Sequence, residues 1–293
     1  MKLLVVGGSG FLGRNVLEAA RSSWELAGTY LRSATFPAFA AKLGCEPIHA
    51  DLLGPVSEWD ADVCIYVAGS SDHRASLASP GDDLRLNAEA LNRFLEGFKG
   101  GLVLMSSAAV YDGFSGSVSP LTKPDPCWPY AISKLASERY VEWYVSAGRL
   151  SWATILRLYY AYGPCDRATR LIPRILQTVN AKAREFVVTA PKASLLDPLY
   201  VGDVAEAALA AASGRAKGKT FDLCGGRART VSDLVREALR VLGVETAVRE
   251  KPRSDEKPVR FHSNPGPCRE RLGLGRFTTF REGLRRTADW TGV

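Results

Sequence analysis

A tyrosine and a lysine four residues apart are the side chains of this sequence best suited to acid–base chemistry. Tyr130 and Lys134 stand at the two ends of the pentapeptide YAISK. On a helix, residues i and i+4 share one face, so the ammonium group lies beside the phenol. A neighbouring positive charge lowers the pKa of a phenol toward neutral pH, and the tyrosine then serves as a general acid or base. Taken alone, the pair is also compatible with a solvated helix face.

A glycine-rich turn near the N-terminus predicts a phosphate site. The apolar run KLLVV, residues 2–6, is typical of a buried parallel strand and ends in GGSGFLG, residues 7–13. Gly7 would permit a tight turn, Gly10 would let backbone approach a pyrophosphate, and Gly13 would allow a helix to pack closely on the strand. An ordinary strand-to-helix turn is the alternative. The dinucleotide contacts expected from this turn are Gly7, Ser9, Gly10, Phe11, Leu12 and Gly13.

Short apolar runs and helical stretches alternate through the first half of the chain. Strands are expected at residues 2–6, 25–31, 45–50, 63–68, 102–105 and 152–160, and helices at 11–22, 36–43, 83–98 and 130–146. This alternation predicts an α/β fold, a Rossmann-type doubly wound parallel sheet with right-handed crossovers. Strand, glycine turn and helix then fall where a dinucleotide-binding fold needs its first βα unit.

The alternation loosens beyond Gly163-Pro164. Residues 185–189, 219–223 and 231–242 are expected to form a smaller lobe added to the sheet, and residues 251–271 an irregular surface rich in Pro and Arg. We therefore expect a dinucleotide-binding domain over residues 1–164, to which later segments can return. Residues 165–293 are expected to be mainly a substrate-binding lobe.

Composition excludes several classes of protein. The 293 residues are 46% hydrophobic and 24% charged, which is ordinary for a soluble chain. No apolar stretch reaches the roughly 18 residues of a membrane helix, so we expect no membrane span and a cytoplasmic location. The six cysteines include no C-x-x-C pair and stand beside no histidine pair, which predicts neither a metal site nor a disulfide framework.

The net charge of +7 is unevenly distributed along the chain. Residues 215–293 hold 18 Lys and Arg against 10 Asp and Glu, whereas residues 1–214 hold 20 against 21. A basic lobe facing a dinucleotide domain suits an anionic substrate such as a nucleotide diphosphate, although a solvated basic surface is the simpler reading. Nucleic-acid binding is disfavoured, because the basic residues come singly, alternate with acids and lack interleaved aromatic residues.

In their order along the chain, the motifs resemble the extended short-chain dehydrogenases/reductases, a family of nucleotide-sugar epimerases, dehydratases and reductases. The resemblance covers nearly the whole chain. It rests on the glycine turn, Asp51-Leu52, Val67-Ala68-Gly69, Asn87, SSAAVY (residues 106–111), Pro129-Tyr130 with Lys134, RLYYAYGP (157–164) and YVGDVA (200–205).

The resemblance implies a role for each matched residue. Tyr130 would exchange a proton with a substrate hydroxyl while hydride passes to or from a nicotinamide, Ser107 would hold the same oxygen, and Lys134 would also bind the nicotinamide ribose. Asn87 would orient a water or stabilise the active-site helix, with helix packing as the plain alternative. Asp51 would contact the adenine amine. The implied cofactor contacts outside the glycine turn are Asp51, Leu52, Val67, Ala68, Gly69, Tyr130 and Lys134.

Three departures from the family pattern bear on the substrate. The arginine that commonly holds the sugar-nucleotide phosphates is replaced in the segment LLDPLY, residues 195–200. Ala108 and Ala109 stand where sugar 4,6-dehydratases carry an Asp-Glu pair, which disfavours a dehydratase. Tyr160 stands where many relatives have asparagine, so the substrate contact there is open.

The end of the second strand bears on which nicotinamide cofactor is used. An NAD-specific fold places a carboxylate there to accept hydrogen bonds from the ribose, whereas NADP needs room and positive charge for a 2′-phosphate. The chain has no carboxylate between Glu25 and Glu46. Arg32 is therefore the candidate phosphate ligand, with Ser33 and Thr35 as hydrogen-bond donors, and NADP is favoured over NAD. Arg32 as a solvated residue or an adenine-stacking residue is the alternative.

Together these features predict hydride transfer at a hydroxyl or keto carbon of a nucleotide-activated sugar by an NAD(P)-dependent epimerase or oxidoreductase. One alternative is an NADPH-dependent ketoreductase of a sugar or another carbonyl compound. The other is a non-catalytic dinucleotide-binding regulator, against which the intact Ser107, Tyr130 and Lys134 argue. The resemblance also implies a homodimer formed through a pair of helices.

Overall fold

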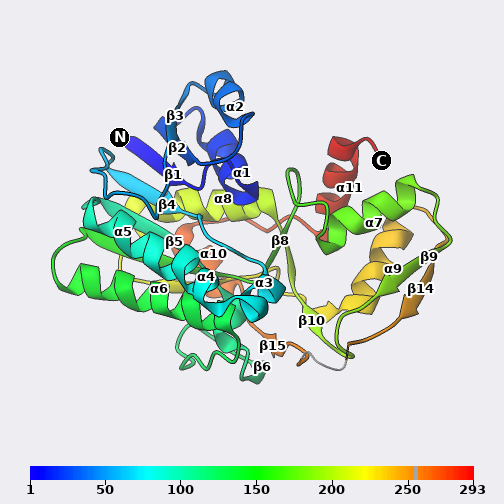
Figure 1. The fold of residues 1–293 in the computed structure, drawn as a ribbon. Coiled ribbons are helices and arrows are strands. Elements are labelled where there is room, and N and C mark those ends of the chain that lie inside the picture. Colours follow the sequence, from blue (N-terminus) through cyan, green and yellow to red (C-terminus); the bar gives the residue numbers. More distant parts are fainter. Residues whose placement is uncertain (254–256) are drawn as a thin grey trace.

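The computed structural model describes residues 1–253 and 257–293, and its centre is a seven-stranded parallel sheet (Figure 1). The strand order is β12-β7-β5-β4-β1-β2-β3. These strands are β1 (Lys2–Val6), β2 (Glu25–Tyr30), β3 (Cys45–His49), β4 (Val63–Tyr66), β5 (Gly101–Ser107), β7 (Trp152–Leu158) and β12 (Thr220–Leu223). The order reverses between β1 and β4, the kind of point at which open parallel sheets bind ligands. The predicted doubly wound fold is confirmed.

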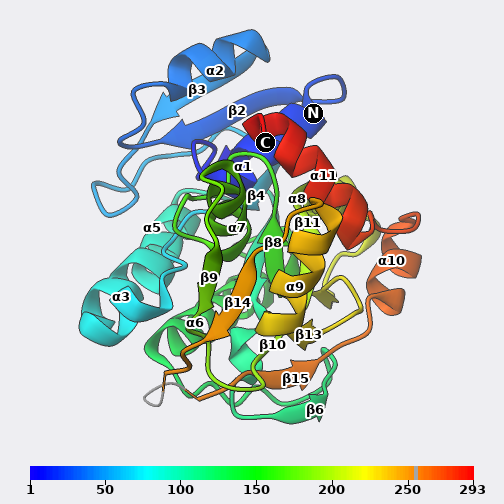
Figure 2. The ribbon, with the colours of Figure 1, turned by 90° about the vertical axis from the view of Figure 1, so that its right-hand side faces the viewer.

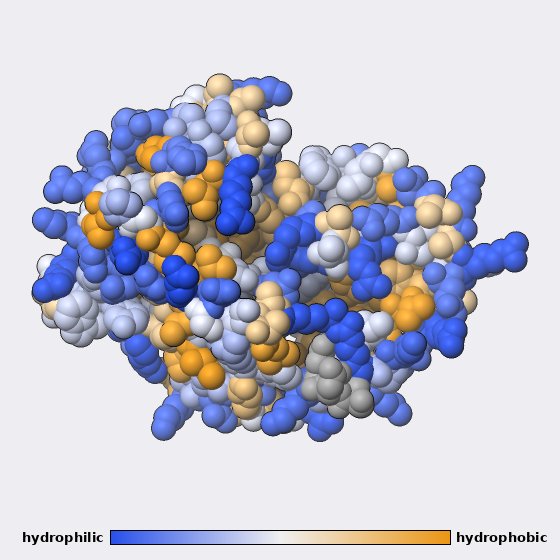
Figure 3. All heavy atoms as spheres, in the orientation of Figure 1, coloured by the Kyte–Doolittle hydropathy of each residue, from blue (hydrophilic) through white to orange (hydrophobic). Residues whose placement is uncertain are grey.

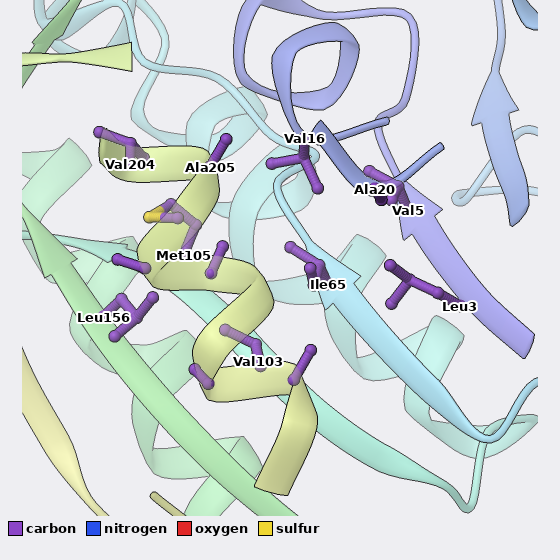
Figure 4. Close-up of a cluster of buried hydrophobic side chains, with 14 of the residues drawn as sticks. Leu3, Val5, Val16, Ala20, Ile65, Val103, Met105, Leu156, Val204 and Ala205 are labelled. Atoms are coloured by element: carbon purple, nitrogen blue, oxygen red, sulfur yellow. The ribbon is translucent and has the colours of Figure 1, made fainter. Parts of the chain in front are cut away.

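Each face of the sheet has its own hydrophobic core, because successive residues of a strand point to opposite faces. In β1, Leu3 and Val5 join the core beneath α1 (Phe11–Ala20) and α8 (Val201–Ala210), shown in Figure 4. Leu4 and Val6 join the opposite core. The first core also receives α2 (Phe36–Lys42) and α10 (Gly266–Leu272), and the second receives α5 (Ala90–Glu96) and α6 (Pro129–Ser146).

A smaller lobe with its own core stands beside the sheet (Figure 2). Its strand pair is parallel, Phe186 facing Val248 across the two strands. Buried side chains of two helices, among them Ile175 and Leu234, complete this core. The lobe contains α7 (Leu171–Asn180), β9 (Glu185–Val188), α9 (Val231–Val241) and β14 (Ala247–Glu250), with α11 (Phe280–Thr291) against it.

Residues 219–223 do not belong to the smaller lobe, contrary to the sequence-based expectation. As β12 they form the edge strand of the main sheet, with Phe221 opposite Leu156 of β7. Three of the four β12 residues are buried against the sheet core. The short apolar run fits either lobe, and only the pairing with β7 decides between them.

The stretch 251–271 is also more ordered than expected, within the part that the structure describes. Residues 254–256 lie outside the described residues. The others include β15 (Arg260–His262), which pairs with β6 (Ser115–Ser117), and α10, whose Cys268 and Leu272 are buried. The prediction of irregular surface is wrong there, because this segment packs on the main sheet's first core.

Two further elements are interrupted where the sequence predicts them to be continuous. The helix expected at 83–98 is divided into α4 (Pro80–Leu84), a π-helix (Arg85–Glu89) and α5, and the strand expected at 152–160 ends at Leu158. The remaining elements are α3 (His73–Ala78), a 3₁₀ helix (Ala108–Tyr111), β8 (Tyr160–Tyr162), β10 (Leu195–Leu196), β11 (Pro198–Tyr200), β13 (Arg229–Thr230) and a second π-helix (Ala211–Arg215).

Candidate active site

A cavity of about 1410 Å³ extends from the carboxyl end of β1 to the smaller lobe. Figure 3 shows the surface hollowed between the two parts, with hydrophilic side chains along the margin. Across one edge, Arg167 Nη2 donates to Ser71 Oγ at 2.6 Å. Twelve predicted site residues line the cavity, namely Gly7, Ser9, Gly10, Phe11, Leu12, Gly13, Val67, Ala68, Gly69, Ser107, Tyr130 and Lys134.

The glycine turn has the geometry that the sequence spacing predicts. Gly7 has a φ of +89°, and its carbonyl oxygen accepts a hydrogen bond from Gly10 N at 3.0 Å. A Cβ at Gly13 would lie 2.2 Å from Gly7 O, so α1 packs too closely on the turn for any side chain. At Gly10 a Cβ would meet, among the described atoms, just Gly7 O at 3.3 Å. That contact is tight, but no other described atom comes as near, so the remaining space beside Gly10 fits a bound pyrophosphate.

Tyr130 lies at the start of α6 and is 7% exposed. Burial raises the pKa of its phenol, and hydrogen bonding with Ser107 opposes this rise. Nearby Asp83 also raises the pKa, and Arg170 opposes the rise. The pKa of Tyr130 is raised overall, opposite to the lowering that the i, i+4 spacing predicted. At neutral pH the phenol is therefore protonated in the protein alone.

Lys134 is one helical turn beyond Tyr130 and equally buried. Its Nζ donates to the carbonyl oxygen of Met105 in β5 at 2.8 Å. Burial lowers the pKa of the Lys134 ammonium to about 8, even though Glu138 and Asp83 act in the opposite direction. The ammonium therefore titrates close to the working pH, whereas an exposed lysine stays charged.

Ser107 ends β5 and faces the same cavity. Its backbone is extended, and its Oγ accepts a hydrogen bond from Ala109 N at 3.1 Å. This bond leaves the hydroxyl proton of Ser107 for another acceptor. The strand end thus positions a hydroxyl group beside the Tyr130 phenol.

Asn87 lies behind the cavity and does not line it. Its Nδ2 donates to Asp83 Oδ1 and to Ser133 Oγ, both at 3.1 Å, and its main-chain carbonyl oxygen accepts from Ser137 Oγ at 3.1 Å. Ser133 and Ser137 both belong to α6. A Cβ at Gly69 would lie 2.4 Å from Asn87 Oδ1, so Asn87 also supports the loop after β4. These contacts support a helix-stabilising role, while the buried Oδ1 of Asn87 has no hydrogen-bond partner among the described residues and could accept from a water.

Arg32, Asp51 and Leu52 lie outside the cavity lining. Arg32 is exposed, Asp51 Oδ1 accepts from Leu53 N at 3.0 Å in its own turn, and Leu52 packs against the second core. Their assignment to the cofactor remains a prediction. Arg14, which the sequence analysis did not consider, is the arginine that contacts Ser33 and Thr35.

The basic residues of the cavity come mostly from a different part of the chain than the charge count suggested. Arg167, Arg170 and Arg174 precede or begin α7, and Arg253 and Lys257 follow β14. Just these last two lie within residues 215–293. The basic surplus of that quarter is thus largely on other surfaces, and the cavity takes its positive charge from both regions.

Two aromatic contacts in the cavity were not predicted. The ring of His73, in α3, lies 4.6 Å from the Tyr130 ring centroid to centroid. The Arg170 guanidinium lies 4.7 Å from the centroid of Tyr160, the tyrosine in the asparagine position of the resemblance. Neither His73 nor Arg170 belongs to a motif, and their proximity depends on packing between elements distant in sequence.

Three further observations concern possible metal ligands, thiols and membrane-spanning helices. In the ranges 1–253 and 257–293, no group of three or more His, Cys, Asp or Glu side chains is placed to hold a metal ion. All six cysteines are free thiols. Among the helices that the structure describes, none has the length and apolar character to cross a membrane.

The chain is similar to known enzymes over nearly its whole length. The chain is 26% identical to GDP-6-deoxy-D-mannose reductase of Pseudomonas aeruginosa, over 99% of this chain and 97% of the relative. It is 25% identical to dTDP-glucose 4,6-dehydratase of Neisseria gonorrhoeae, over 98% and 94%. A solved structure of UDP-glucuronic acid 4-epimerase from Bacillus cereus, in complex with UDP-glucuronic acid and NAD, has the same fold. That match has a TM-score of 0.87 and 20% sequence identity, and it covers 100% of this chain and 99% of the epimerase chain.

The family model described as the NAD dependent epimerase/dehydratase family matches residues 3–224. This range runs from β1 through β12 and includes the glycine turn, Ser107, Tyr130 and Lys134. The chain belongs to the NAD-dependent epimerase/dehydratase family, the extended short-chain dehydrogenases/reductases.

Proposed function

We propose that this protein transfers hydride between a nicotinamide cofactor and a hydroxyl or keto carbon of a nucleotide-activated sugar. One observation carries the proposal: Ser107, Tyr130 and Lys134 line the same cavity as the glycine turn. A proton donor and a dinucleotide site that share a cavity can act on one carbon–oxygen bond. The bound cofactor would supply or accept the hydride at that carbon.

The chain's own residues would manage the proton. Tyr130, whose pKa is raised by burial, gives its proton to the carbonyl oxygen during reduction and takes it back from the hydroxyl during oxidation. Ser107 would donate its hydroxyl proton to the same oxygen and hold it against Tyr130. The Lys134 ammonium would stabilise the phenolate that forms, because it follows Tyr130 by one helical turn. All three residues are buried at the wall of the cavity, and a bound substrate would displace the water beside them.

A nucleotide sugar is supported by the charge and size of the cavity. The part of the cavity away from the glycine turn is lined by basic residues that suit a diphosphate, namely Arg167, Arg170, Arg174, Arg253 and Lys257. Leu196 replaces the arginine of the resemblance and also lines the cavity, so the phosphates would rely on these other basic residues. The relatives named above act on GDP-, dTDP- and UDP-linked sugars by their names.

Reduction would start from the form of Tyr130 that the raised pKa implies, since a protonated phenol can donate to a carbonyl oxygen. An epimerase would first need a proton acceptor, and a dehydratase would need acidic residues where Ala108 and Ala109 stand. The test incubates purified protein with GDP-, UDP- and dTDP-linked sugars and their 4-keto forms, with each nicotinamide cofactor, and analyses the products. Stoichiometric oxidation of NADPH indicates a reductase, and sugar conversion without net redox indicates an epimerase. If the protein binds the dinucleotide tightly but converts none of these substrates, the non-catalytic regulator is favoured.

The homodimer remains a proposal, which the exposed face of α6 supports. Ile132, Tyr140 and Trp143 are 51%, 46% and 50% exposed and follow one stripe of the helix. Leu84, at the end of the neighbouring α4, is 48% exposed. Light scattering after size exclusion should give twice the monomer mass for the wild type and the monomer mass for an Ile132→Glu/Trp143→Glu variant. Trp290→Glu on α11, equally exposed in the wild type, should remain dimeric.

A further inference from the structure

An arginine of α1 joins the glycine turn to the end of β2. Arg14 Nη2 donates to Ser33 Oγ at 3.3 Å and to Thr35 Oγ1 at 3.2 Å. Its Nε donates to the carbonyl oxygen of Ser9 at 3.1 Å. The two hydroxyl oxygens are 3.4 Å apart. One guanidinium group and two hydroxyl groups therefore meet where the predicted pyrophosphate turn approaches the strand that carries the adenosine ribose in dinucleotide folds.

The guanidinium is held in place without a carboxylate partner. It lies 4.6 Å from the centroid of the Phe39 ring, and Arg14 as a residue is half-buried. None of the ion pairs within residues 1–253 and 257–293 includes Arg14. Thr35 occupies the N-cap position of α2, yet its hydroxyl accepts no hydrogen bond from that helix and faces Arg14 instead. A fixed, unneutralised guanidinium beside two hydroxyl donors is suited to a phosphate monoester.

The strand end lacks the carboxylate that would repel such a phosphate. β2 ends at Tyr30, and Leu31 and Arg32 follow. Arg32 is exposed and adds a second positive charge to the same loop. An acidic residue here would accept hydrogen bonds from both ribose hydroxyls and select NAD. In this chain the side chains of Arg14, Ser33 and Thr35, which the structure brings together at the loop, can each donate to an anion.

We infer that Arg14, Ser33 and Thr35, with Arg32 at the rim, bind the 2′-phosphate of NADP, and that Arg14 is the main determinant of preference for NADP over NAD. The inference rests on the nicotinamide cofactor of the proposed function. Ser33 and Thr35 accept hydrogen bonds from Arg14 in the structure and would turn their own protons toward the phosphate. Of the two arginines, the sequence pattern pointed to Arg32, with Ser33 and Thr35, since Arg14 approaches this loop through the packing of α1 on β2.

Binding titrations test the inference without requiring turnover. Calorimetry would measure the affinities of wild type, Arg14→Gln and Arg32→Ala for NADPH, NADH, 2′,5′-ADP and 5′-ADP. Arg14→Gln should weaken NADPH and 2′,5′-ADP by about 10- to 100-fold, the scale of a charge-assisted hydrogen bond, and change NADH and 5′-ADP by less than about twofold. Arg32→Ala should lose less, because its side chain is exposed. Arg21→Gln, at the opposite end of α1, should bind all four ligands as the wild type does.

Three results would overturn the assignment. Equal losses for NADPH and NADH in Arg14→Gln would make Arg14 a support of the glycine turn through Ser9. A selective loss in Arg32→Ala alone would transfer the role to Arg32, and wild-type preference for NADH would exclude a 2′-phosphate site. If Arg14→Gln fails to fold by circular dichroism, the Ser33→Ala/Thr35→Ala double variant should show the same selective loss for 2′,5′-ADP. A different result would contradict the proposed hydride transfer and leave the 2′-phosphate site intact. In that result Tyr130→Phe turns over substrate normally and still binds 2′,5′-ADP.

Discussion

The Arg157 guanidinium donates to both carboxylate oxygens of Glu138, from Nε at 3.0 Å and from Nη2 at 2.7 Å. The two side chains are 5% and 0% exposed. Burial alone would lower the pKa of Arg157, but the pairing with Glu138 outweighs it and raises that pKa. Glu138 also accepts from Ser106 Oγ at 2.6 Å, and Arg157 donates to the Tyr111 hydroxyl. This buried network fixes the end of β5 directly beside Ser107, the proposed partner of Tyr130.

Replacing Glu138 with Gln should therefore destabilise the fold by about 3–5 kcal/mol, because it leaves the Arg157 charge buried without a counter-charge. Urea unfolding followed by circular dichroism would measure the loss. The matched control is Glu142→Gln, which breaks an exposed pair with Arg139 on the same helix and should cost less than about 1 kcal/mol. Equal free energies of unfolding in the two variants would contradict a structural role for the Glu138 pair.

Replacing Tyr130 with Phe keeps the ring and removes the proton donor. Turnover should fall by roughly 100-fold or more, whereas cofactor affinity should be nearly unchanged, since the hydroxyl acts on the reacting oxygen. Steady-state kinetics and cofactor titration would be compared for the same preparation. Tyr140→Phe, on the exposed part of α6, provides the control with wild-type activity expected. An active Tyr130→Phe enzyme would remove Tyr130 from the mechanism.

The rate of ketone reduction should fall as pH rises through about 8. The pKa of the Lys134 ammonium is lowered by burial from 10.5 to about 8, so its positive charge is present below that pH and lost above it. The pKa of Tyr130 is raised above 10, so the phenol keeps its proton over the same range. A pH profile of kcat/KM checks this.

Lys134→Arg distinguishes that titration from other alkaline effects. A guanidinium keeps its charge through this range, so the variant should be slower overall and lose the decrease near pH 8. An unchanged decrease in Lys134→Arg would assign the titration to another group.

Gly10→Val should fold and fail to bind the dinucleotide. A Cβ at Gly10 would make one tight contact, with Gly7 O at 3.3 Å, and the rest of the branched side chain would occupy the volume expected for the pyrophosphate. Gly13→Val should instead disrupt folding, because a Cβ there would lie 2.2 Å from Gly7 O. Thermal unfolding and calorimetric titration of NADPH would separate the two effects. Normal cofactor binding by a folded Gly10→Val protein would place the phosphate site elsewhere.

Local pattern was sufficient for the fold class and for the glycine turn. Short continuous apolar runs indicate strands that are buried on both faces of a parallel sheet. The steric requirements at Gly7 and Gly13 arise between residues that are close in sequence. The i, i+4 spacing likewise put Tyr130 and Lys134 on one helix. Family resemblance, confirmed by the match over residues 3–224, supplied Ser107 and the kind of chemistry.

Tertiary packing decided what depends on distant segments. Burial beneath β5 raised the pKa of Tyr130 and lowered that of Lys134, reversing the expectation drawn from their spacing. Pairing with β7 drew residues 220–223 into the main sheet, and the packing of α1 brought Arg14 to Ser33 and Thr35. The burial of a residue and its contacts with distant elements exist only in the folded chain, so the sequence pattern around that residue does not predict them.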